Sequence, residues 1–154
     1  FPINANDLEF IGPQVPMYNL ETRIIGNNNW QKLSILQKEN IGPHLKGLSI
    51  ITNFNKQIID LDLYKGDHQQ SFYNGYNSAR LLKAVNLEDQ SRKSLNETLQ
   101  NLDFHRGIGF FYSPSLINNH INSAFQILEF DGQGFKHQGV FNGDSLQIVL
   151  SQNP

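Results

Sequence analysis

The chain contains no cysteine among its 154 residues. Disulfide bonds and thiolate chemistry are therefore excluded, and packing alone must hold the core together. Long apolar runs are also missing, since the longest, such as residues 48–51 and 146–150, fall far short of the roughly 18 residues that a membrane-spanning helix needs. We therefore predict a soluble chain with no transmembrane segment.

The sequence also has no block of like charge. Its 12 Lys and Arg residues nearly balance 14 Asp and Glu residues, for a net charge of −2. Because nucleic-acid binding draws on clustered basic side chains, we expect no nucleic-acid partner.

Amide side chains supply most of the polarity. Asparagine and glutamine together number 32, about a fifth of the chain, whereas charged residues make up 17%. An amide-rich surface is typical of many proteins that work outside the cytosol, although AT-rich genomes produce the same composition. The first residue is Phe1 rather than Met, which either a cleaved signal peptide or a trimmed chain leaves. We expect an extracytoplasmic protein, secreted or periplasmic.

The length is that of one ordinary domain, so we predict a single domain over residues 1–154. Three prolines among the first sixteen residues disfavour regular helix and predict an extended N-terminal arm over residues 1–18. Residues 22–36 and 47–67 each hold two apolar runs divided by Asn- or Gly-containing segments, which predicts two β-hairpins.

The middle and the end of the chain differ in character. Residues 76–102 contain no Gly or Pro, and their leucines share one helical face, which predicts two helices that meet near Asn86. Strand patterns return after Gly107, and Asn142–Gly143 predicts a two-residue turn with positive φ. We therefore predict an α+β fold, in which an antiparallel β-sheet ends in a C-terminal β-meander and two central helices pack on one face.

The run NLDFHRGIGFFYSPS, residues 101–115, places a histidine and an arginine beside two glycines. A phosphate-binding glycine loop requires a strand before it and a helix after it, and this run has the reverse order. We interpret the run as a helix exit, in which His105 and Arg106 face the negative helix end and Gly107 is a left-handed cap. This interpretation predicts a raised pKa for His105.

A second candidate is DLDLYKGDH, residues 60–68, with three aspartates and a histidine. Tyr64 and Lys65 occupy positions where an EF-hand needs an oxygen ligand and a glycine, so that loop is excluded. An acid–base or unusual metal site remains as a hypothesis, with Asp67, His68 and His105 as the candidate catalytic residues, joined by Asp62. The histidines lack metal-ligand spacing, and no cofactor motif occurs, so we expect neither a metal nor a cofactor.

The third candidate is aromatic. Trp30, Phe72, Tyr73 and Tyr76 lie among Asn and Gln residues, and flat rings beside amides suit a protein or carbohydrate ligand. The alternative interpretation is that these rings cap the hydrophobic core where sheet meets helix.

These observations favour a non-catalytic binding or interaction module that is secreted or periplasmic. The alternative is a hydrolase or metal-dependent enzyme that uses dispersed Asp and His residues. Convergence of Asp67, His68 and His105 in one cleft would favour the enzyme, and their separation would favour the binding module. Nothing in the sequence indicates an oligomeric state.

Overall fold

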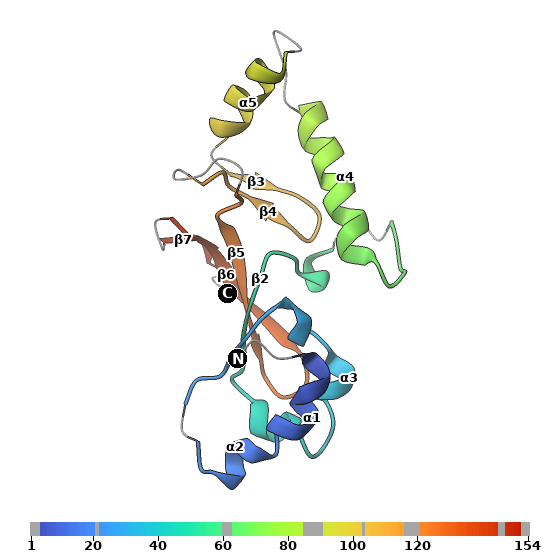
Figure 1. Cartoon of the computed structure of the whole chain (residues 1–154), viewed down its shortest axis with the longest axis vertical. Coiled ribbons are helices and arrows are strands. Elements are labelled where there is room, and N and C mark those ends of the chain that lie inside the picture. The colour runs from blue at the N-terminus through green and yellow to red at the C-terminus, as the bar shows by residue number, and fades with distance from the viewer. Residues whose placement is uncertain are drawn as a thin grey trace. The chain divides into compact units, whose positions relative to one another are not determined.

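The computed structural model describes residues 4–20, 22–59, 63–84, 91–102, 104–115, 121–144 and 147–151. Helices and strands both occur, with a mostly antiparallel sheet and a separate two-stranded sheet, so the α+β class is confirmed at this level (Figure 1). The helices are α1 (Leu8–Ile11), α2 (Gln14–Met17), α3 (Leu33–Leu36), α4 (Gln69–Ala84) and α5 (Arg92–Gln100), with 3-10 turns at Ala5–Asp7, Asn28–Trp30, Gly42–Leu45 and Lys56–Ile58.

The larger sheet has the strand order β1-β2-β5-β6-β7. Its strands are β1 (Ile25–Gly26), β2 (Ser49–Thr52), β5 (Ala124–Phe130), β6 (Phe135–Asn142) and β7 (Gln147–Ser151). The smaller sheet pairs β3 (His105–Arg106) with β4 (Phe111–Tyr112). None of the helices in the described ranges combines the length and the apolar character needed to cross a membrane.

Contacts divide the chain into two compact units. The first unit comprises Phe1–Thr52, Gln126–Val140 and Leu150–Pro154, and the second comprises Asn53–Phe125 and Phe141–Val149. Whether the two units unfold together, as expected of a single domain, stays a prediction.

Burial alternates along β5, whose residues from Gln126 onward belong to the first unit. Its side chains are buried at every second position from Ala124 to Phe130, the pattern of a strand with one face in a core. The antiparallel register with β2 places Ile50 opposite Leu128, and both are 0% exposed. The core of the first unit consists of Leu8, Trp30, Ile35, Leu36, Ile41, Leu45, Leu48, Ile50, Leu128 and Phe130.

The N-terminal segment differs from the extended arm expected over residues 1–18. It forms a 3-10 turn followed by α1 and α2, and Leu8 is completely buried in the core of the first unit. Pro13 and Pro16 occupy the N-cap and the first turn of α2. Backbone N–H groups in a first helical turn have no partner within the helix, so proline is tolerated there.

The first N-terminal hairpin does not form, and residues 47–59 and 63–67 form no hairpin among themselves; one reason applies to both. In the first, Oδ1 of Asn27 accepts the backbone N–H of Asn29 at 2.9 Å and begins a helical turn, while β1 pairs in parallel with β2. In the second, Asn55 caps the next turn in the same way, and β2 pairs with β5 instead. Residues 60–62 of that expected hairpin lie outside the described part of the chain.

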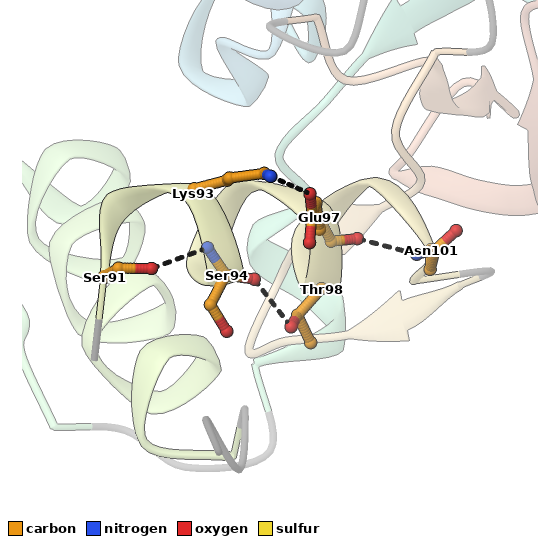
Figure 2. A network of polar contacts seen from close by, with 6 residues as sticks. All are labelled: Ser91, Lys93, Ser94, Glu97, Thr98 and Asn101. Carbon is orange, nitrogen blue, oxygen red and sulfur yellow. Dashed lines mark hydrogen bonds and ion pairs between the residues drawn. The ribbon is translucent and has the colours of Figure 1, made fainter. Parts of the chain in front are cut away.

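The two central helices are α4 and α5, both in the second unit. α4 begins at Gln69 rather than at Tyr76, and Asn86, the expected cap of the second helix, lies outside the described residues. Figure 2 shows that Ser91 caps α5, accepting the N–H of Ser94 at 3.1 Å. Further bonds along α5 join Thr98 to the Ser94 carbonyl, Asn101 to the Glu97 carbonyl, and Lys93 to the Glu97 carboxylate.

The turn predicted at Asn142–Gly143 is also wrong in its conformation. Positive φ among the described residues occurs at Asn19, Gly47, Gly109, Gly132 and Gly139, and not at this pair. Asn142 is the last residue of β6, and its Oδ1 accepts the N–H of Asp144 at 2.9 Å. The side chain thus turns the chain without a left-handed backbone.

Candidate functional site

The run around His105 is a β-hairpin rather than a helix exit. β3 and β4 pair His105 with Tyr112, and the N–H of Gly107 donates to the carbonyl of Phe110 at 2.8 Å. The left-handed residue is Gly109, with a φ of +66°, whereas Gly107 does not have positive φ. The helix-exit interpretation is therefore wrong.

Gly107 serves a different purpose, because it allows the side chain of Asn77 to approach the hairpin. A Cβ atom at Gly107 would lie 2.7 Å from Cγ of Asn77, closer than such atoms tolerate. The Asn77 amide then pairs with both backbone groups of Ile108, accepting its N–H at 2.8 Å and donating to its carbonyl at 2.9 Å. Asn77 and Ile108 are both buried, so this pair satisfies backbone groups that water does not reach.

A pocket of about 450 Å³ lies beside this contact, within the second unit. It is bounded by α4, by the end of α5 and by the β3–β4 hairpin, whose course can be followed in Figure 1. Its apolar lining residues are Leu81, Leu82, Leu99 and Phe110. Its polar lining residues are Asn74, Asn77, Ser78, His105, Tyr112 and Asn122.

Most amide and hydroxyl groups of the pocket wall already have partners. The Asn77 amide is hydrogen-bonded to the backbone of Ile108. The Asn122 amide accepts the N–H of Ser113 at 2.9 Å and donates to the Phe111 carbonyl at 2.8 Å. The hydroxyl of Ser78 donates to the backbone carbonyl of Asn74 at 2.8 Å. In contrast, Oδ1 of Asn74 is buried and has no hydrogen-bond partner among the described residues.

The two titratable groups of the wall are both held in their neutral forms. Burial lowers the pKa of His105, and the positive charge of Arg80 lowers it further. Burial also raises the pKa of the Tyr112 phenol. The described lining residues include no Lys, Arg, Asp or Glu, so at neutral pH the wall is uncharged.

Comparisons with known proteins assign no family. No protein-family model and no curated protein matches the chain. Among solved structures, it resembles the leucine-binding protein LivK of Thermotoga maritima with a TM-score of 0.49 and 13% sequence identity. The match covers 93% of this chain and 44% of that protein, so the chain spans less than half of its length.

Among the candidate catalytic residues that the structure describes, only His105 lies in the pocket. His105 contributes to the wall, whereas Asp67 and His68 are exposed residues that precede α4 and are not part of the lining. Asp62 lies outside the described residues. Within the described ranges, no three His, Asp or Glu side chains gather as a metal site.

The four aromatic candidates are divided between core and surface. Trp30 is 0% exposed in the core of the first unit, and Tyr73 is 0% exposed in that of the second, so neither presents a ring to solvent. Phe72, Tyr73 and Tyr76 all belong to α4. Tyr76 is partly buried and packs against the core of the second unit, whereas Phe72 is exposed. Phe72 stacks on Tyr64 and on Tyr76, with centroids 4.9 and 6.3 Å away.

Sequence reasoning missed most of the pocket. Asn74, Asn77 and Asn122 carry no motif, and they come from segments up to 48 positions apart in the chain. The available signal is the pair Gly107 and Gly109, of which the helix-exit interpretation uses only Gly107.

We expect the replacement His105→Gln to reduce the loss of stability in mild acid. A histidine whose folded pKa lies below its unfolded value of 6.5 stabilises fully above 6.5 and loses this contribution as the pH falls toward the folded value. Urea midpoints measured near pH 8 and near pH 5 should therefore differ less in the variant than in the wild type. Arg80→Gln should reduce the difference in part, and a larger acid loss in His105→Gln would contradict the account.

Proposed function

We propose that this protein is a non-catalytic binding module that holds a small, uncharged ligand in the pocket of the second unit. The observation that carries the proposal is the composition of this pocket, in which four apolar side chains surround a few neutral polar groups. Small-molecule sites commonly have this character, with apolar walls for affinity and few polar groups for orientation. A volume of about 450 Å³ suits a ligand of small-molecule size.

The neutral state of His105 and Tyr112 supports an uncharged ligand. An ionic ligand would lose its hydration in this wall without gaining an opposite charge from the described lining residues. The proposal therefore favours a small molecule over the protein or carbohydrate ligand that the aromatic residues suggested. Phe72 and Tyr76 stack against neighbouring rings, which leaves less ring face for a sugar.

The hydrolase alternative receives less support. Hydrolysis by a histidine base needs a nucleophile or water beside it and a group that orients the imidazole. The Ser78 hydroxyl donates to a backbone carbonyl instead, and the described pocket wall has no carboxylate.

The proposal includes the parts of the sequence prediction that the fold leaves open. We propose that the last three strands form an antiparallel meander and that α4 and α5 pack on one face of a sheet. We also propose an extracytoplasmic location, supported by the amide-rich composition with 17% charged residues.

Binding of a neutral aromatic fragment tests the proposed site. N,N-dimethylbenzamide should bind with a dissociation constant in the range of about 1 to 10 mM, as expected for a small fragment with a largely apolar contact. In an NMR titration of the ¹⁵N-labelled protein, backbone shifts should concentrate at Leu81, Leu99 and Phe110.

The variant Ser78→Trp should abolish this binding, because Ser78 is exposed, lines the pocket and would fill it with an indole ring. Ala79→Trp is the matched control, since Ala79 is an exposed neighbour on α4 outside the lining. Equal binding by Ser78→Trp and Ala79→Trp, or shifts spread over the surface, would overturn the proposed function.

A further inference from the structure

We infer that the ligand presents an amide edge, an N–H donor beside a C=O acceptor, to the side chain of Asn74. This inference deepens the proposed function and rests on it. The chemical class is a neutral primary carboxamide or lactam attached to an apolar body.

Asn74 differs from the other asparagines of the wall in its hydrogen bonding. Asn77 and Asn122 each use both ends of the amide on backbone groups of the β3–β4 region. Asn74 uses neither end on a described residue, and its Oδ1 is nevertheless buried. A buried acceptor without a partner is rare in folded proteins and calls for an explanation.

A ligand in the pocket supplies the hydrogen-bond partner that Oδ1 of Asn74 lacks. Asn74 belongs to the pocket wall, and the last torsion of an asparagine side chain is soft, so the amide turns toward a ligand at little cost. A free carboxamide offers one acceptor and a donor side by side, and its complement is another amide edge. Two such hydrogen bonds give a partner to the buried Oδ1 of Asn74 and to its Nδ2.

The rest of the pocket wall suits the apolar body of this ligand. Leu81, Leu82, Leu99 and Phe110 provide the apolar surface for a ring or an alkyl group. The uncharged His105 and Tyr112 impose no requirement for an ion. A benzamide-like molecule, with its ring on the leucines and its amide at Asn74, meets each of these conditions.

The test compares two probes that differ in the amide donor, benzamide and N,N-dimethylbenzamide. Wild-type protein should bind benzamide about tenfold more tightly, because only benzamide donates to the buried Oδ1 of Asn74. In Asn74→Leu the ratio of the two dissociation constants should fall close to one, while N,N-dimethylbenzamide still binds. Asn101→Leu, at an exposed asparagine beyond α5 that is not part of the wall, should keep the wild-type ratio.

The outcomes separate this inference from the proposed function. Equal binding of both probes to the wild type, or a tenfold preference that persists in Asn74→Leu, overturns the inference and leaves the pocket as a ligand site. Failure of both probes to bind overturns the proposed function, and the inference with it. Circular dichroism checks the fold of Asn74→Leu, and Asn74→Ala gives the same comparison if the leucine variant does not fold.

Discussion

Replacement of Leu128 by alanine should cost the first unit about 3 to 4 kcal/mol of unfolding free energy. Leu128 is 0% exposed and pairs with Ile50 of the neighbouring strand β2, and both side chains belong to the core of the first unit. Truncation removes apolar contacts and leaves a cavity that a sheet held in register cannot fully close. Urea unfolding followed by the fluorescence of Trp30, the one tryptophan of the chain and a member of the same core, measures the loss directly.

The matched control is Met17→Ala, since Met17 is 75% exposed on α2 in the same unit. This control should leave the midpoint nearly unchanged. Far-UV circular dichroism reports mainly on α4 and α5 of the second unit. If the chain unfolds as one domain, Leu128→Ala should lower both midpoints together, and two separate transitions would contradict the single domain.

Asn77→Ala should destabilise the second unit by about 3 kcal/mol, a large effect for a polar residue. The replacement leaves the N–H and the carbonyl of Ile108 buried without partners, and each unsatisfied buried group costs about 1 to 3 kcal/mol. Thermal unfolding followed by far-UV circular dichroism measures the shift.

Asn101→Ala is the control for this effect. Asn101 also donates its amide to a backbone carbonyl, that of Glu97, but at an exposed site where water replaces the lost bond (Figure 2). Its cost should stay within about 0.5 kcal/mol. Equal costs for Asn77→Ala and Asn101→Ala would show that the contact between α4 and the hairpin contributes little to stability.

Local sequence patterns predicted that helices precede Gly107 and that strands follow it. Strand patterns return after Gly107, and β5 forms there at Ala124–Phe130. Its buried face is not readable from the sequence, because Gln126 is buried while Phe125 and Ile127 are only partly buried. The absence of glycine and proline from residues 76–102 likewise predicts α4 and α5, although α4 extends back through Gly75 to Gln69. Packing of Tyr73, 0% exposed, favours that extension more than one glycine opposes it.

Asparagine was the residue type that local reasoning misread. At positions 27 and 55 we expected turns between strands, and at position 142 a turn with positive φ. Each side chain instead accepts a backbone N–H two residues ahead. Asparagine suits both a tight turn and a helical cap. It tolerates the positive φ of the turn, and its side-chain oxygen accepts a backbone N–H as a carbonyl would. Which one occurs depends on whether a partner strand is available, and β2 finds its partner in β5, far along the chain.

The sequence by itself determined the absence of thiol chemistry, the balance of charge and the return to strands after Gly107, because these depend on composition or on near neighbours. The tertiary structure alone decided the pocket. Asn74, Leu99 and His105 come together through the folding of α4, α5 and a hairpin, and the burial that lowers the pKa of His105 exists only after they pack. Contacts between distant segments leave no local periodicity, so their chemistry becomes visible only in the folded chain.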